Sequence, residues 1–295
     1  LTARAEELIA GLAAEAAALT LDGATINWDD EPLAKIVPGR SPLAPQLQGD
    51  GALDALPPEL RRRLLEAVGG WFERRLELLA PLRRLDAAST DPAAGPELRA
   101  LLIRLVEHGG MLEREGAGLD RLDRPKRARL GNLGVRIGAL DLFVPALLKP
   151  GPLAAWHALQ MATGCTDPAP LGAMPAVVPL THKACPPGYR ALGKQALRLD
   201  MAEKLLREAH GIRVATASSS GRGSFVLDPA RAVSMGLSTA SYALLLRRAG
   251  FQPSVPRALA EGAFGPSAPP RWRWRPPRRG GNEPLGAVPV APGNA

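Results

Sequence analysis

The stretch GYRALGKQ, residues 188–195, comes closest to a nucleotide-binding motif. It places Gly188, Gly193 and Lys194 at the spacing of a phosphate-binding loop, in which backbone N–H groups and the lysine hold the phosphates. Gln195 stands where such loops carry the serine or threonine whose hydroxyl binds Mg²⁺, and the preceding ACPP is not a buried strand. We therefore interpret 188–195 as a glycine-rich turn before a helix, and we expect no ATP hydrolysis by this chain alone.

A second group of residues could hold a metal: His157, Cys165, His182 and Cys185. Zinc needs four ligands, which usually come from two closely spaced pairs. His182 and Cys185 form one such pair, whereas His157 and Cys165 are too widely spaced to form a good second one. Packed or free thiols explain both cysteines more simply. We predict no metal and no cofactor in this chain, with a metal at Cys165 and Cys185 as the open alternative.

No nucleophile stands beside a base that could activate it. The serine-rich SSSGRGS, residues 218–224, has no neighbouring histidine or acid, and there is no G-x-S-x-G motif. A flexible polar loop is the simpler interpretation of this stretch. The sequence therefore predicts no catalytic residue.

Two clusters of basic residues favour a nucleic-acid partner. One is RLDRPKRAR, residues 121–129, and the other is RWRWRPPRR, residues 271–279. Arginine neutralises phosphates and tryptophan offers a face on which bases stack, so the second cluster predicts binding of single-stranded RNA or DNA. A solvated, solubilising surface is the alternative in both places. The candidate binding residues are Arg121, Arg124, Lys126, Arg127, Arg129, Arg271, Trp272, Arg273, Trp274, Arg275, Arg278 and Arg279.

A possible helix-turn-helix lies between these two clusters. A short helix at 229–235 is followed by a turn at Gly236 and by a second helix, which Ser238 can cap and which ends in Arg247 and Arg248. An ordinary pair of packed helices has the same pattern. The element is therefore an alternative candidate for reading a nucleic-acid groove.

Composition supports a basic, folded protein. The 295 residues include 37 Lys and Arg against 29 Asp and Glu, for a net charge of +8, which favours a polyanionic partner. A hydrophobic fraction of 46% is enough for a core, and no apolar run approaches the length of a membrane span. The two cysteines exclude a disulfide framework. Because the first residue is Leu1, we expect a fragment whose upstream part is missing.

Helical periodicity outnumbers strand patterns, so we predict a mainly α fold with a few short β hairpins and strands, of the α+β class. The chain divides into a helical region at 1–110 with a hairpin near 21–37, a mainly helical accessory domain at 111–265 with a strand segment at 134–144, and a disordered Arg/Pro-rich tail at 266–295. Residues 38–58 are expected to form a loop, and 224–227 a strand. The expected helices are 2–18, 60–79, 96–108, 118–130, 152–162, 197–210, 229–235 and 239–249.

Four blocks of sequence resemble a known family. They are NWDDEPLAKIV, RLGNLGVRIGALDLFVPALLKP, GYRALGKQALRLDMAEKL and FVLDPARAVSMGLSTASYALLLRRAGF, in that order. Together they resemble the C-terminal region of alphaproteobacterial helicases related to the mitochondrial degradosome RNA helicase, a superfamily-two DExH-type motor. The resemblance covers most of residues 1–279, and a basic tail is a further shared feature.

The resemblance implies an ATP-dependent helicase acting on RNA or DNA in the bacterial cytoplasm. ATP and Mg²⁺ would bind only to motor domains in cis, because their phosphate loop, DExH box and arginine finger have no matching positions in this chain. The region itself would guide or grip the translocating strand. A stand-alone helical scaffold that binds a protein partner through a basic tail is the competing interpretation.

Overall fold

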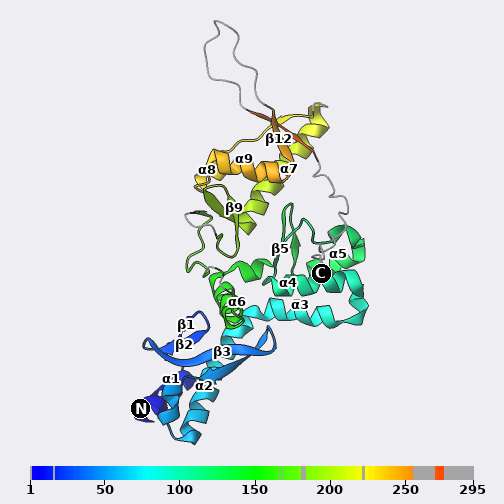
Figure 1. Cartoon of the computed structure of the whole chain (residues 1–295). Helices are drawn as coiled ribbons and strands as arrows, with labels where there is room; N and C mark the ends of the chain where they lie inside the picture. Colours follow the sequence, from blue (N-terminus) through cyan, green and yellow to red (C-terminus); the bar gives the residue numbers. More distant parts are fainter. Residues whose placement is uncertain are drawn as a thin grey trace, which may run out of the picture.

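A computed structural model describes residues 2–15, 17–165, 167, 169–180, 184–220, 223–254 and 270–275. The chain forms an elongated molecule, with its first helices and strands at one end and its last ones at the other (Figure 1). Helices and small antiparallel sheets occur throughout the described residues, which confirms the α+β class predicted from the sequence.

The α-helices are α1 (Thr2–Ala13), α2 (Pro58–Leu76), α3 (Ala80–Thr90), α4 (Gly95–Glu107), α5 (Arg124–Asn132), α6 (Pro150–Ala162), α7 (Leu199–Ser220), α8 (Ala230–Ser234) and α9 (Thr239–Arg248). Short 3₁₀ turns are η1 (Gly51–Ala55), η2 (Glu77–Leu79), η3 (Pro92–Ala94), η4 (Leu119–Arg121) and η5 (Pro145–Leu148). The strands are β1 (Thr20–Asp22), β2 (Thr25–Trp28), β3 (Glu31–Ser41), β4 (Ala44–Gly49), β5 (Met111–Glu113), β6 (Arg136–Ile137), β7 (Asp141–Phe143), β8 (Val177–Pro179), β9 (Tyr189–Leu192), β10 (Gln195–Arg198), β11 (Phe225–Val226), β12 (Phe251–Ser254) and β13 (Arg271–Trp274).

The first sheet is larger than the hairpin predicted near 21–37. It has four antiparallel strands in the order β1-β2-β3-β4, so the loop predicted at 38–58 is wrong for the stretch that forms the end of β3 and all of β4. Pro38 lies where the β3–β4 register shifts, and Pro45 lies on the edge strand β4. Bulges and edge strands are the places in a sheet that tolerate proline.

The helices of the first half follow their apolar periodicity closely. Leu64, Val68, Phe72 and Leu76 form the buried face of α2, and the helical path changes at η2 before Pro81 enters the first turn of α3. Proline fits a first turn because it has no N–H to contribute there. Helix α4 matches its prediction, whereas α1 ends five residues early and α5 begins six residues late.

The buried apolar side chains of the described residues form two main hydrophobic cores. The first runs from Ala5 to Leu159 without a break near residue 110, the boundary expected from the sequence. The second runs from Leu192 to Trp272 and joins α7, α8 and α9 to the sheet β11-β13-β12. We call residues 199–275 the C-terminal unit. None of the helices in the described ranges is long and apolar enough to cross a membrane.

The stretch that resembles a phosphate-binding loop is a β-hairpin. Strands β9 and β10 are antiparallel neighbours, and Gly193, at φ 69°, lies with Lys194 in the turn between them. The predicted turn is confirmed, but the chain continues as strand β10 before helix α7 begins. A phosphate loop would instead lead from a strand directly into a helix.

Candidate nucleic-acid interface

The arginine- and tryptophan-rich stretch forms the central strand of a sheet. Strand β13 pairs with β11 on one side and with β12 on the other, so that Trp272 lies opposite both Phe225 and Pro253. Alternation along a strand sends Trp272 to the inner face and its arginine neighbours outward, and Trp272 is only 5% exposed. The disordered tail predicted from 266 onward is therefore wrong for Arg271–Trp274. Residues 266–269 and 276–295, with Arg278 and Arg279, lie outside the described residues.

Both tryptophan side chains are engaged within the protein. Trp272 belongs to the second core, together with Phe225 and Phe251. The Trp274 indole N–H donates to the carbonyl of Ala249 at 2.9 Å, and the Arg213 guanidinium lies 4.5 Å from its ring centroid. The physical reason for predicting single-strand binding, stacking of bases on these rings, is not supported by their positions.

Four exposed arginines gather where α9, β12 and β13 meet. We call Arg247, Arg248, Arg273 and Arg275 the arginine cluster. The backbone N–H of Arg275 donates to the carbonyl of Gly250, which follows the end of α9, and Arg273 lies opposite Gln252 in the sheet. Gly250 adopts φ 87°, and a Cβ at this position would overlap the carbonyl oxygen of Arg275, so glycine is required for this close approach.

No carboxylate in the described ranges forms an ion pair with the arginine cluster. Among the described residues the C-terminal unit has nine Lys and Arg but only four Asp and Glu. Three of those acids have other partners: Asp200 pairs with Arg198, Glu208 pairs with Arg231, and Glu203 accepts backbone hydrogen bonds. Among the described residues, therefore, no acid neutralises the cluster.

The basic cluster at 121–129 has a different environment. Lys126 forms an ion pair with Glu97 at 2.8 Å, Arg129 pairs with Asp91, and Arg127 donates to the Leu119 carbonyl at 2.8 Å. These contacts attach α5 to α4 and to the neighbouring 3₁₀ turns. Arg121, Arg124 and Arg127 are exposed and have no ion pair within the described part of the chain, so acids neutralise two of the five charges in this cluster.

The helix-turn-helix pattern corresponds to a real structural element. Helix α8 ends at Ser234 and the chain turns at Gly236, whose φ is 88°. The Ser238 hydroxyl accepts from the Ser241 backbone N–H at 3.1 Å to cap α9. The side chain of Gln195 spans the turn, donating to the Gly236 carbonyl and accepting from the Ser238 N–H, each at 2.9 Å. The residue that disqualified the phosphate loop therefore positions α9, a role that its sequence position did not reveal.

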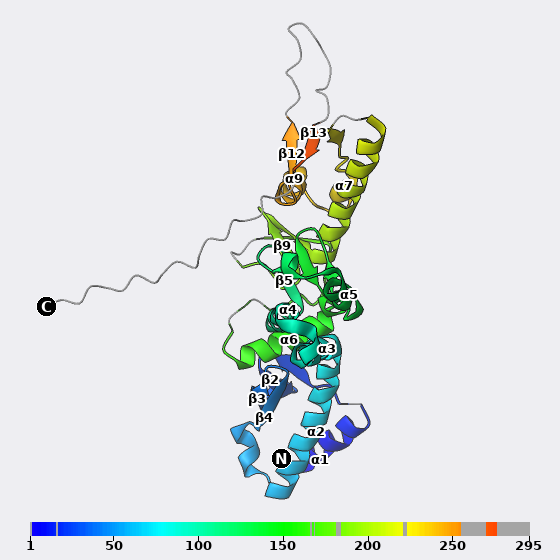
Figure 2. The same ribbon diagram turned by 90° about the vertical axis from the view of Figure 1, so that its right-hand side faces the viewer.

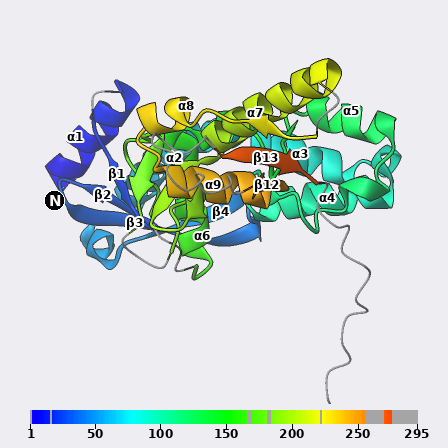
Figure 3. The same ribbon diagram turned by 90° about the horizontal axis from the view of Figure 1, so that it is seen from above.

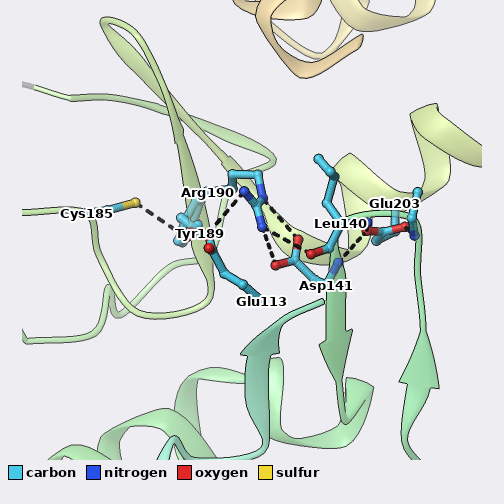
Figure 4. Close-up of polar contacts among 8 residues, drawn as sticks. Glu113, Leu140, Asp141, Cys185, Tyr189, Arg190 and Glu203 are labelled. Atoms are coloured by element: carbon cyan, nitrogen blue, oxygen red, sulfur yellow. Dashed lines mark hydrogen bonds and ion pairs between the residues drawn. The ribbon is translucent and has the colours of Figure 1, made fainter. Parts of the chain in front are cut away.

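A buried polar network connects the loop between β6 and β7 to the strands and helix that follow (Figure 4). Glu203 on α7 accepts backbone hydrogen bonds from Ala139, Leu140 and Asp141 at 2.5, 2.8 and 3.0 Å. Arg190 on β9 forms a two-point ion pair with Asp141, at 3.0 Å to Oδ2 and 2.5 Å to Oδ1. The side chains of Glu203, Arg190 and Asp141 are all buried, so the network joins the two main cores structurally.

The proposed zinc ligands do not form a metal site in the described residues. The Nε2 atom of His157 lies 3.1 Å from the carbonyl of Asp167, and the Cys185 thiol donates to the Tyr189 carbonyl at 3.4 Å. Burial raises the pKa of Cys185, which opposes formation of the thiolate that binds zinc. No group of three possible ligands occurs in the described ranges, and His182 lies outside them.

We expect His210 to make the stability of the C-terminal unit depend on pH. Burial lowers its pKa below 6.5, and the nearby charges of Arg213 and Arg114 act in the same direction. Because the unfolded chain then binds more protons, we expect stability to fall as pH is lowered through about 6.5 towards the folded-state pKa. Urea midpoints measured between about pH 7.5 and 5.5 should fall less steeply in His210→Phe. Equal slopes in both proteins would contradict this assignment.

The chain matches none of the protein-family models, curated proteins or solved structures with which it was compared.

Proposed function

We propose that this chain is a nucleic-acid-binding accessory region of an ATP-dependent helicase, and that the arginine cluster provides its main contact with phosphates. The single observation that carries the binding is a set of four exposed guanidinium groups without an ion-pair partner in the described residues. The helicase context rests on the four blocks of sequence that resemble the family. The motor domains in cis would supply ATP hydrolysis.

Counterion release allows the proposal to be tested through the salt dependence of binding. A guanidinium that contacts a phosphate displaces condensed cations, so the logarithm of the binding constant falls with the logarithm of salt concentration. An arginine that already pairs with a carboxylate contributes less, because binding must first break that pair. Two of the five basic residues at 121–129 already form ion pairs, so we expect the arginine cluster to contribute more to binding.

We expect the double variant Arg247→Gln, Arg273→Gln to weaken binding and to reduce the salt slope by about 1.8 on duplex or about 1.4 on single strands. Fluorescence anisotropy with a labelled oligonucleotide at several salt concentrations measures both quantities. The matched control is Arg121→Gln, Arg124→Gln, which removes the same charge from the other basic cluster and should change the slope by less than about 0.5.

Two results would contradict the proposal. A larger effect of the control pair would place the binding site on α5. No detectable binding of any oligonucleotide by the unaltered chain at low salt would favour the helical protein-interaction scaffold instead.

A further inference from the structure

The order of elements in the C-terminal unit is that of a winged helix-turn-helix. Helix α7 is followed by β11, by the helix pair α8–α9 and by β12 and β13, and the last strand lies in the middle of the sheet. All three strands pair antiparallel. In helix-turn-helix proteins the second helix of the pair enters a groove of the nucleic acid, and α9 occupies that position here.

One face of α9 is open to solvent. Ser241, Tyr242, Leu245 and Leu246 form its buried face. In the views of Figures 2 and 3, α9 lies on the opposite side of the unit from α7, and no helix of the described ranges covers its outer side. The residues exposed there are Thr239, Ala240, Leu244, Arg247 and Arg248, with Ala243 partly exposed.

The first half of this open face is smooth. Thr239, Ala240 and Ala243 have short side chains, and Leu244 leans against the β9–β10 turn, where a Cβ on Gly193 would lie 3.3 Å from its Cδ1. Such a surface can approach the floor of a groove closely. Thr239 is its only side chain with a hydrogen-bonding group, so it can form few of the contacts that distinguish one base pair from another.

The helix is held firmly in place. Gln195 joins the turn before it through two hydrogen bonds, and the Ser241 hydroxyl donates to the Leu192 carbonyl at 2.9 Å. The arginine cluster lies at the C-terminal end of α9, where a helix seated in a groove meets the phosphate backbone. A smooth rigid helix, ending in arginines that have no ion pair in the described part of the chain, suits contact with shape and phosphate rather than with sequence.

The width of the major groove determines which kind of nucleic acid can accept helix α9. The major groove of B-form DNA is about 12 Å wide and admits a helix, whereas the major groove of A-form RNA is too narrow for one. A single strand has no groove, and the two tryptophans are engaged within the protein. Resting on the function proposed above, we infer that the C-terminal unit binds double-stranded DNA, with α9 in the major groove, and does so with little dependence on sequence.

The test compares two variants that add the same carboxylate to exposed alanines. Ala240→Glu places it on the open face of α9, and Ala128→Glu places it on α5. Ala240 is the second residue of its helix, where an acidic side chain favours helix formation, so this variant should fold. Far-UV circular dichroism and thermal unfolding check both proteins before any titration.

Each protein is titrated with two unrelated DNA duplexes, the separate strands and an RNA duplex of matching sequence. The unaltered chain should bind both DNA duplexes equally and about tenfold more tightly than the other ligands, a difference worth 1.4 kcal/mol. Ala240→Glu should lose about tenfold on DNA duplexes, while Ala128→Glu changes less than about twofold.

The possible outcomes distinguish a failure of this inference from a failure of the proposed function. Tighter binding of single strands or of the RNA duplex would overturn the inference, as would equal effects of the two glutamates. In those cases a reduced salt slope in Arg247→Gln, Arg273→Gln would still support nucleic-acid binding. Absence of binding to all the oligonucleotides would reject the proposed function itself.

Discussion

Trp272→Ala is expected to destabilise the C-terminal unit by about 3–5 kcal/mol, the usual loss when a large buried aromatic side chain is removed. The Trp272 ring lies in the second core between Phe225 and Pro253 on the neighbouring strands. Its removal leaves a cavity that both strands line. Urea or thermal unfolding followed by far-UV circular dichroism measures the change without depending on tryptophan fluorescence.

The matched control lies on the same strand. Arg273→Ala alters an exposed side chain and should change the unfolding free energy by less than about 0.5 kcal/mol. Trp272→Phe should recover part of the lost stability, because a smaller aromatic ring still fills some of the space. If Trp272→Ala unfolded at the same urea concentration as the unaltered chain, residues 271–274 would belong to a disordered tail after all.

Asp141→Ala is the second substitution with a large expected effect, a loss of about 3–5 kcal/mol. It leaves the Arg190 guanidinium, 8% exposed, without the carboxylate that now binds it at two points. Burial raises the pKa of Asp141, and hydrogen bonds from Arg190 oppose that shift. The carboxylate and the guanidinium therefore depend on each other. Urea unfolding of the variant gives the loss directly.

Two further variants test whether the expected loss of stability comes from burial of the Asp141–Arg190 pair or from the loss of a charge alone. Glu113 also lies 3.3 Å from Arg190 but is largely exposed, so Glu113→Ala should cost about 1 kcal/mol or less. Asp141→Ala combined with Arg190→Met removes both buried charges and should recover much of the loss, because apolar side chains can replace a buried ion pair at little cost. Equal losses for Glu113→Ala and Asp141→Ala would contradict the importance of burial.

The α-helices were predictable because their signals are local. Leu64, Val68 and Phe72 repeat at helical spacing within a few turns, and Ser238 caps α9 by accepting from a backbone N–H three residues along the chain. Each of these features acts between residues that the chain itself keeps close. The helix pair α8–α9 was predictable for the same reason. Whether one face of α9 stays exposed depends instead on which other elements pack against it.

The strands were harder to predict, because a strand is stabilised by partners that can lie anywhere in the chain. RWRW alternates as a strand should, yet the Pro-rich composition around it indicated disorder. Its partners Phe225 and Phe251 lie 20 or more residues upstream. The sequence suggested tryptophans that stack on bases, and the sheet places them in the core or against protein groups.

By itself, the sequence determined the α+β class, most of the helices, the excess of positive charge and the lack of a complete nucleotide-binding motif. Those properties depend on composition and on neighbours within a few residues. Only the tertiary structure decided which charges remain free. Lys126 and Arg129 meet acids from α4 and from the turn before it, whereas Arg247 and Arg273 meet none among the described residues. Charge neutralisation depends on distance in space, and folding sets that distance between residues far apart in the chain.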